Sequence, residues 1–248
     1  MPENVRYELT QPQYLEFLTN IQNYFDANEN TIHKARNILK TIEHKDKELV
    51  VKSFQVPNLL RRIIYTFFRD SKAKKSYEYA LKIQPFTPMP IGYVEFYQNS
   101  LLKRSFFVAE KFDYDFTIRE PLLDSSFFER EKIFKAFAKF TYQLHERGIL
   151  HKDYSPGNIL VKRQNDSYLF QIVDINRMEF KTLSFYERMA NFDKLWARNE
   201  DLEIIVKEYA RVAKIDEKSA VKTALKASQK LKKRKNFKKR LKGKPVND

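Results

Sequence analysis

The stretch HKDYSPGNILV, residues 151–161, places His151, Asp153 and Asn158 a few positions apart, directly before an apolar run. These residue types also suit a simpler structure, because Asp and Asn form turns readily and a histidine can be satisfied in a core. The surrounding sequence favours a functional loop. An apolar helical pattern precedes the stretch, and the sequence IVDI brings Asp174 sixteen residues after Asn158. The polar residues of this segment are therefore the first candidates for chemistry.

Composition limits the classes of protein that this chain can represent. Its 248 residues suffice for one domain or two small lobes with a substantial core, and 42% of them are hydrophobic. The lack of cysteine excludes disulfides and thiolate chemistry, and it suits a reducing compartment. The N-terminal sequence MPENVRYELTQPQYLEF carries charges where a signal peptide needs an apolar core, and no apolar run reaches the roughly 18 residues of a membrane span. We therefore expect a soluble protein, or one attached to a membrane surface.

The first half of the chain combines strand and helix patterns. Residues 57–69 predict a helix with an apolar face, which we expect to pack on the sheet rather than to lie in lipid. A second helix follows at about 71–84, with Asp70 or Ser71 as its N-cap. Four segments have strand patterns: 36–44, 48–54, 91–98 and 104–110. The first two are predicted to form a hairpin with KDK at its turn.

Beyond the sequence KFDYD the pattern changes to helices around one short hairpin. An apolar helical stripe runs from Phe127 to Leu144 and closes at Gly148, a C-cap residue. The strand patterns ILVKR and YLFQIVDI follow, and helices fill most of 185–213. This order predicts an α+β fold with two unequal lobes, and a cleft between lobes is a usual place for a ligand. We predict three parts: an N-lobe at 1–111, a C-lobe at 112–217, and a basic helix or tail at 218–248.

The segments LHERGILHKDYSPGNILV and FQIVDINR resemble the catalytic loop and the metal-binding strand of the protein-kinase-like superfamily. That pattern is H-x-D, an Asn five residues after the Asp, an apolar strand, and a second Asp at the end of another strand. The resemblance implies a bilobal kinase-like fold, with an antiparallel-sheet N-lobe and a reduced helical C-lobe. It implies that Asp153 orients or deprotonates the acceptor hydroxyl, and that Asn158 and Asp174 hold Mg²⁺ against the phosphates of ATP. His151 would brace the loop.

A kinase also needs a cation on the nucleotide phosphates, normally a strand Lys that is paired with a helix Glu. The stretch ELVVKSF supplies Lys52, and KKSYEYALKI supplies Glu78 in the following helix. Lys52 could instead be a surface lysine of the strand, and Glu78 could lie on a solvated face of the helix. Their order relative to the catalytic loop favours the functional roles. The glycine-rich loop is absent, since no glycine precedes Gly92. In such a loop, glycine lets backbone N–H groups approach the phosphates closely. Here residues 30–37 would have to bind the phosphates less closely, or Arg36 would contribute positive charge. This gap keeps a non-catalytic pseudokinase module open.

Departures from the protein-kinase pattern indicate a particular branch. Ser155 stands where Ser/Thr protein kinases carry Lys, DIN replaces D-F-G, no A-P-E motif occurs, and only 74 residues follow Asp174. These features are similar to the atypical small-molecule and RIO-like kinases. Within about residues 36–196, five blocks in order resemble the bacterial lipopolysaccharide kinase family: VVKSFQVPNLLRRIIY, RDSKAKKSYEYALKI, TPMPIGYVEF, HKDYSPGNILV and IVDINRMEF.

The family resemblance implies transfer of the γ-phosphate of ATP to a sugar hydroxyl of lipid A-linked Kdo or core heptose. The reaction would take place at the cytoplasmic face of the inner membrane. Arg177 would then meet an acidic sugar carboxylate or cap the loop. Two other classes stay open: an atypical, RIO-like protein kinase, which has little peptide-docking surface in so short a C-terminal region, and the pseudokinase module.

Positive charge is concentrated near the C-terminus. Residues 218–244 carry thirteen of the fifteen net positive charges, which leaves +2 for the remainder. The segment suits a solvated tail, a nucleic-acid contact, or a helix on anionic lipid, and Phe237 and Leu241 favour the helix at an interface. With a lipid-linked acceptor, we expect an anionic membrane surface rather than nucleic acid as its partner. Val221, Ala224, Leu225, Ser228 and Leu231 share the helical spacing.

Overall fold

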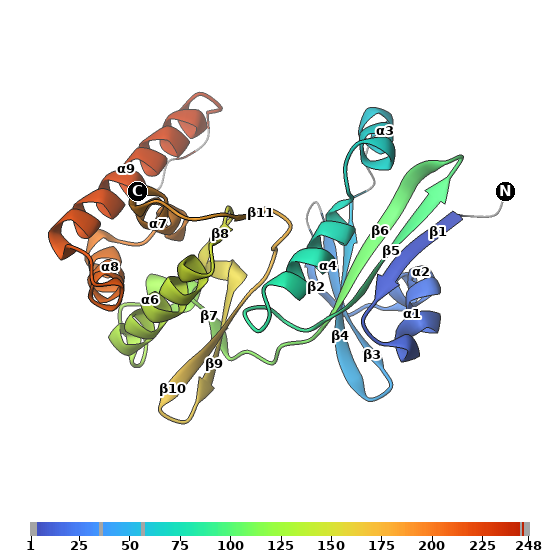
Figure 1. Ribbon diagram of the computed structural model, residues 1–248, viewed down its shortest axis with the longest axis horizontal. Coiled ribbons are helices and arrows are strands. Elements are labelled where there is room, and N and C mark those ends of the chain that lie inside the picture. The colour runs from blue at the N-terminus through green and yellow to red at the C-terminus, as the bar shows by residue number, and fades with distance from the viewer. Residues whose placement is uncertain (1–3, 35–36, 56–57, 244, 246–248) are drawn as a thin grey trace. The chain divides into compact units, whose positions relative to one another are not determined.

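The computed structural model describes residues 4–34, 37–55, 58–243 and 245, and the chain divides into two compact units after Asp113. The first unit is built on one antiparallel sheet, and the second on helices around two small sheets (Figure 1). The predicted α+β class is therefore confirmed.

Six antiparallel strands form the sheet of the first unit, in the order β1-β5-β6-β4-β3-β2. The predicted hairpin is β3–β4, and Lys45 and Asp46, both with positive φ, form its turn. The sequence did not predict β1, which lies along β5. The strands are β1 (Asn4–Leu9), β2 (Thr31–Lys34), β3 (Ile38–His44), β4 (Lys47–Phe54), β5 (Pro90–Gln98) and β6 (Leu101–Glu110).

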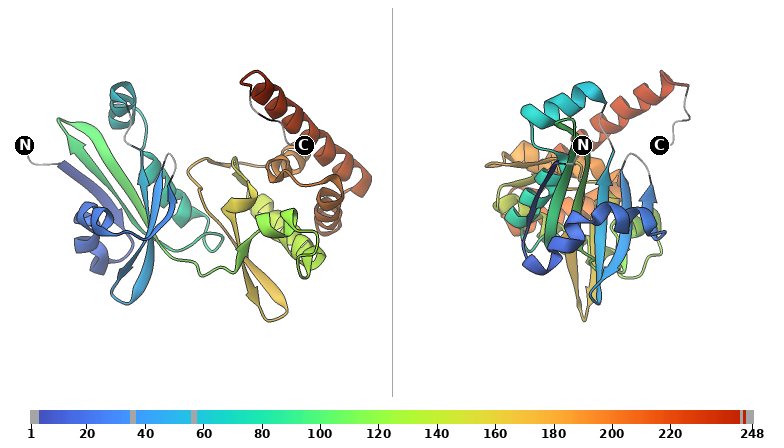
Figure 2. Two further views of the ribbon diagram at one scale, coloured as in Figure 1. Left: turned by 180° about the vertical axis from the view of Figure 1, so that it is seen from behind. Right: turned by 90° about the vertical axis from the view of Figure 1, so that its right-hand side faces the viewer.

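Helices cover both faces of this sheet (Figure 1 and the left view of Figure 2). Phe17 and Phe25, from α1 and α2, pack with Val51 in an apolar core on one face. The next alternating positions of β4 point to the other face, where Phe54 packs with Tyr77 of α4. The helical elements are η1 (Pro12–Tyr14), α1 (Leu15–Thr19), α2 (Ile21–Ala27), α3 (Leu59–Phe67) and α4 (Lys72–Lys82).

The cap predicted for α4 is confirmed. The Ser71 hydroxyl oxygen accepts a hydrogen bond from the Lys74 N–H at 3.1 Å, which satisfies one of the unpaired N–H groups at the start of the helix. Of the two candidate caps, Ser71 is therefore the one used, while Asp70 forms an ion pair with Lys74.

The helix predicted at 57–69 is α3, but its orientation differs from the expected one. Its large apolar side chains lie in solvent, with Leu60 and Phe67 exposed by 68% and 65%. The polar side of the helix contacts β6 instead, because the start of β6 extends past the end of β4 and offers unpaired backbone groups there. Arg62 and Thr66 bind those groups at Leu102. The expectation that the apolar face packs on the sheet is therefore wrong.

The second unit is organised around α6, which packs on α8, and α8 in turn packs on α9. Its strands form two sheets, ordered β10-β9-β7 and β11-β8, and β9–β10 is the predicted hairpin. The strands are β7 (Phe116–Thr117), β8 (Ile149–His151), β9 (Ile159–Gln164), β10 (Ser167–Ile172) and β11 (Met178–Phe180). The helices are α5 (Arg119–Leu123), α6 (Arg130–Glu146), η2 (Pro156–Asn158), α7 (Phe185–Ala190), η3 (Asn191–Leu195), α8 (Asn199–Ala213) and α9 (Glu217–Arg240).

The boundaries of α6 confirm one part of the predicted stripe and shorten another. Phe127 and Phe128 precede the helix, and Phe128 is exposed. The end is as predicted: Gly148 follows the helix with φ +67°, and a Cβ built there would lie 2.7 Å from the Lys181 carbonyl oxygen.

The basic C-terminal segment forms α9, the last helix in chain order, drawn in red in Figure 1. Its side chains at Ala220, Ala224 and Leu231 are buried, and the helix contacts α7, η3 and α8. Farther along, Phe237 and Leu241 are exposed. In the described part of the chain, no helix has both the length and the apolar character needed to span a bilayer.

Gly148→Ala should lower the free energy of unfolding by about 2–4 kcal/mol, because it combines a left-handed backbone with a clash against the backbone. Gly243→Ala is the matched control, since Gly243 has φ +61° and nothing within 4 Å of its built Cβ. Backbone strain alone should cost that variant about 1–2 kcal/mol at most. Urea unfolding of both proteins measures the difference, and equal losses would contradict the crowding described at Gly148.

Candidate active site

The loop between β8 and β9 is closed by hydrogen bonds to the Asp153 backbone. The Asp153 carbonyl accepts from the Ser155 N–H at 2.7 Å and from the Asn158 Nδ2–H at 2.9 Å. The Asn158 N–H donates to the Ser155 carbonyl at 2.9 Å, within the 3₁₀ turn η2. With its Nδ2 used in this way, the Asn158 side chain presents its oxygen, which makes no hydrogen bond to the described residues. An amide oxygen is therefore available at the start of β9.

The register of the β9–β10 hairpin brings Asp174 next to Asn158. The ladder pairs Ile159 with Ile172, and the Val173 N–H extends it by donating to the Asn158 carbonyl at 2.9 Å. Asp174 directly follows the residue that is bonded to Asn158. Its φ of 56° is left-handed, and its Oδ1 accepts from the Asn176 Nδ2–H at 2.9 Å. The two predicted metal ligands thus lie at the same end of one hairpin.

An amide oxygen beside a carboxylate fits Mg²⁺, which prefers hard oxygen ligands and keeps several waters. The hairpin supplies this pair from two adjacent strand ends, Asn158 and Asp174, without further protein ligands. The chemistry of the donors therefore agrees with a magnesium site at this end of the hairpin.

His151 joins the loop to the strand that carries Asp174. The Asp153 N–H donates to His151 Nδ1 at 3.1 Å, so Nδ1 is unprotonated and the proton lies on Nε2. Nε2–H then donates to the Val173 carbonyl at 2.9 Å. Burial lowers the pKa of the His151 imidazole, which keeps the ring neutral and preserves both hydrogen bonds. The ring acts as a rigid spacer between Asp153 and Val173.

A second buried network anchors the loop from the opposite side. Asn191 Nδ2–H donates to the His151 carbonyl at 3.0 Å, and its oxygen lies 3.0 Å from His145 Nε2. His145 Nδ1 lies 2.9 Å from the Tyr209 hydroxyl, which connects α6 to α8. Asn191 and Tyr209 were not predicted from the sequence, because neither belongs to the motif that contains the loop.

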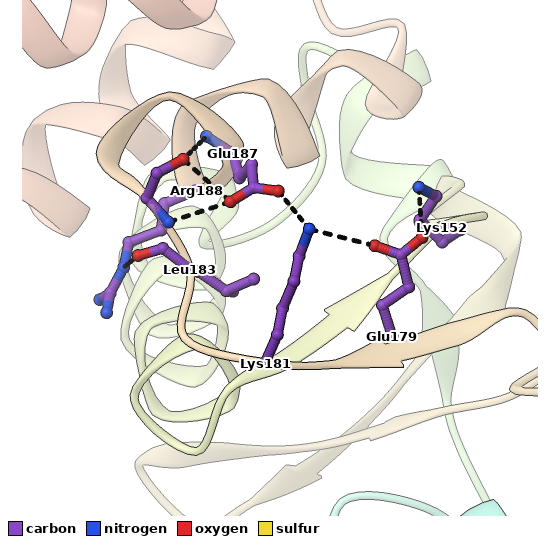
Figure 3. Close-up of polar contacts among 7 residues, drawn as sticks. Lys152, Glu179, Lys181, Leu183, Glu187 and Arg188 are labelled. Carbon is purple, nitrogen blue, oxygen red and sulfur yellow. Dashed lines mark hydrogen bonds and ion pairs between the residues drawn. The ribbon is translucent and has the colours of Figure 1, made fainter.

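Ion pairs tie the loop to β11 and α7 at the surface (Figure 3). Lys152 lies 2.7 Å from Glu179, and Lys181 bridges Glu179 and Glu187. Glu187 also accepts from the Ser184 N–H at 3.0 Å, in a capping box that begins α7. The Lys181 ammonium and these N-cap bonds lower the pKa of the Glu187 carboxyl to about 2. Exposed pairs of this kind stabilise little individually, so their main effect is to orient the segment after Asp174.

Two basic side chains lie beside the loop. Arg177 Nη1 is 3.9 Å from Asp153 Oδ2, the candidate catalytic carboxylate. A contact of Arg177 with a sugar carboxylate stays a prediction. Arg119 lies against Gly157, where a built Cβ would be 2.5 Å from its guanidinium. Arg119 was not predicted from the sequence, because it begins α5, far before the loop, and the residues around it match no part of the motif.

The first unit holds the other two candidates, Lys52 and Glu78. Lys52 is buried on β4 with its Nζ 5.4 Å from the centre of the Phe54 ring, on the sheet face covered by α4. Glu78 is one helical turn from Lys74 and lies 3.6 Å from its ammonium. The predicted pairing of Glu78 with Lys52 stays a prediction.

The substitute predicted for the glycine-rich loop is described only in part. Thr31–Lys34 form β2, whereas Arg36 lies outside the described residues.

Comparisons with known proteins assign the chain to a family. The sequence model of the lipopolysaccharide kinase (Kdo/WaaP) family matches residues 69–215, which is more than half of the chain and includes the whole loop. A solved structure, "WaaP in complex with acyl carrier protein", is 15% identical with a TM-score of 0.57, and the match covers 91% of this chain and 99% of that one. The likeness confirms the predicted protein-kinase-like fold. No protein with a curated description matches the sequence.

Stability should fall in mild acid because of the buried network. Burial lowers the pKa of His145 to about 4, against about 6.5 for an unfolded histidine. Between about pH 6.5 and pH 4, His145 is therefore protonated in the unfolded chain but not in the folded one. The free energy of unfolding consequently decreases as the pH falls through this range. The loss for this group approaches about 3 kcal/mol.

Urea unfolding at neutral pH and at pH 5 tests this expectation. His145→Gln removes the titrating group, so the pH-dependent loss should shrink in the variant, with the contribution of His151 remaining. An identical pH dependence in both proteins would contradict a neutral, buried His145.

Proposed function

Because this chain belongs to the lipopolysaccharide kinase (Kdo/WaaP) family of sugar kinases, we propose that it phosphorylates a hydroxyl of lipid A-linked Kdo or core heptose. The family establishes a phosphotransferase that uses ATP and acts in lipopolysaccharide core synthesis. The observation that supports the phosphotransfer chemistry of this proposal is the backbone bond from Val173 to Asn158, which brings Asp174 next to Asn158 at the loop.

Asp153 would receive the acceptor hydroxyl. Its side chain is 39% exposed, so an incoming alcohol can reach the carboxylate. The peptide carbonyl and N–H of Asp153 are both engaged, by Asn158 and His151, which holds the backbone of the residue and so the direction of its Cα–Cβ bond. A carboxylate held in this way can orient the hydroxyl and take its proton as the phosphoryl group is transferred.

Asn158 and Asp174 would hold Mg²⁺, which when bound neutralises the charge of the transferring phosphate. The Asn176 amide bonds one oxygen of Asp174 and so orients the carboxylate. Lys52, buried among apolar neighbours on β4, would contribute a positive charge to the nucleotide phosphates. Glu78, which lies 3.6 Å from Lys74 on α4, would position Lys52.

Arg177 would select the acceptor. Its guanidinium is 63% exposed and lies beside Asp153, where the acceptor hydroxyl would arrive. An acidic sugar would offer a carboxylate to the free donors of this group, and a phosphorylated heptose would offer a phosphate. Both proposed acceptors therefore suit a cation at this position.

We place the enzyme at the cytoplasmic face of the inner membrane, as a peripheral protein. Support comes from Lys222, Lys226 and Lys230, which recur one turn apart on α9 and line a groove with Tyr186 of α7. None of the three forms an ion pair within the described ranges, and like charges four residues apart repel each other. An anionic lipid surface would relieve this repulsion, at about 1 kcal/mol for each basic residue near the membrane.

Asp153→Asn should reduce phosphate transfer from [γ-³²P]ATP to Kdo-lipid A or to heptose-containing acceptor by about 10²–10⁴-fold, since it removes the proton acceptor and leaves the loop folded. Asp166→Asn is the matched control, because Asp166 lies in the turn at the other end of the same hairpin. It should retain full activity.

The same assay separates the other functions. Labelled protein without labelled lipid would indicate an atypical protein kinase, and the absence of any transfer, with no thermal stabilisation by Mg-ATP, would indicate a pseudokinase.

Asp174→Asn and Asn158→Ala should abolish the thermal stabilisation that ATP gives in the presence of Mg²⁺, because each removes one metal ligand. Asp153→Asn should keep this stabilisation, since Asp153 is assigned to the acceptor. Chelation of divalent ions should act on the wild-type protein as the two ligand variants do. If ATP stabilises Asp174→Asn as well as it does the wild type, the assignment of Asp174 to the metal is wrong.

A further inference from the structure

Helix α3 (Leu59–Phe67) has the opposite orientation to most helices on a protein surface. A surface helix usually turns its apolar stripe to the core and its polar residues to solvent. Five apolar side chains, four from α3 and that of the following Phe68, are 38–78% exposed, Ile64 is half-buried, and none of the described side chains of the helix is buried. The exposed set is Leu59, Leu60, Ile63, Phe67 and Phe68.

Directional bonds fix this orientation. Arg62 Nε–H donates to the Leu102 carbonyl at 2.8 Å, and its Nη2 lies 3.4 Å from the carbonyls of Gln98 and Leu101. One turn farther along, the Thr66 hydroxyl accepts from the Leu102 N–H at 3.0 Å. Figure 1 shows α3 near the end of the sheet at which β5 turns into β6. Turning the apolar face inward would break each of these bonds and leave backbone groups of the turn unsatisfied.

The charge around this face is of one sign. Residues 55–69 contain Arg61, Arg62 and Arg69 but no Asp or Glu. The first acid after the helix, Asp70, is 2.9 Å from Lys74 and is therefore neutralised by its own neighbour. A contiguous apolar face bordered by positive charge is typical of helices that lie in the plane of an anionic bilayer. A second copy of the chain would bring the same charge to the contact, so the pattern favours lipid over self-association.

We propose that α3 and Phe68 form a membrane-inserting face, with their apolar side chains among the acyl chains and Arg69 at the level of the anionic headgroups. The inference rests on the proposed function, because a lipid-linked acceptor brings this enzyme to a membrane. It adds the protein surface that would contact the acyl chains of that membrane.

The face has a distinct physical signature. The lysines of α9 attract anionic lipid through charge alone, and salt screens such attraction. Insertion of leucine and phenylalanine side chains is driven by the removal of apolar area from water, which salt does not weaken. Binding that persists at high salt therefore reports on α3.

Flotation with vesicles of phosphatidylethanolamine and phosphatidylglycerol at high salt tests the proposal. Leu60→Ser with Phe67→Ser should lower the bound fraction at least about tenfold, since two large apolar side chains leave the membrane. Leu123→Ser with Phe128→Ser is the matched control, because these side chains of the second unit are 76% and 72% exposed. It should bind as the wild type does.

A fluorescent reporter avoids any dependence on a polar substitution. In a Trp196→Phe background, which removes the single tryptophan of the chain, Phe67→Trp should shift its emission to the blue when vesicles are added, and Phe128→Trp should not. No shift at position 67, or equal high-salt binding by the serine variant and the wild type, would overturn the proposal. Conversion of a dimer to a monomer by the serine variant, without loss of vesicle binding, would identify a second copy as the occupant and overturn it as well.

These measurements need neither ATP nor a sugar acceptor, so they can fail while the proposed kinase activity stands. In the opposite case, vesicle binding through α3 by a protein that transfers no phosphate would retain the membrane face and reject the activity.

Discussion

One backbone hydrogen bond, from the Val173 N–H to the Asn158 carbonyl, sets the geometry on which the candidate site depends. It extends the β9–β10 ladder by one residue and so brings Asp174 to the end of the hairpin where Asn158 begins β9. A register shift of one residue would turn the side chains of one strand to the opposite face and separate the amide from the carboxylate. The apolar pattern of both strands, with Ile159, Val161, Phe170 and Ile172 buried, opposes such a shift.

The remainder of the second unit holds the loop against this hairpin. His151 spans from Asp153 to Val173 because its buried ring stays neutral and uses one nitrogen as acceptor and the other as donor. Asn191 fixes the His151 backbone from α6 and α8 through His145 and Tyr209. The loop is thus positioned by side chains that need not touch substrate, all of which lie in the second compact unit.

Local interactions made much of this predictable from sequence. The proximity of Asn158 and Asp174 follows from a hairpin of neighbouring strands, Ser71 caps α4 through the Lys74 N–H, and Gly148 ends α6 with its N–H bonded to the His145 carbonyl. Contacts between distant segments were not predictable. Periodicity gives α3 an apolar face, but its direction is decided by unpaired groups at Leu102, far along the chain.

The most direct test of the central claim is a crystal structure with a non-hydrolysable ATP analogue and Mn²⁺ in place of Mg²⁺, in which anomalous scattering locates the metal. We predict one ion bound at about 2.1–2.2 Å by both the Asn158 oxygen and the Asp174 carboxylate, with the remaining positions taken by phosphate and water. A metal bound by only one of these side chains, or by neither, would contradict the account.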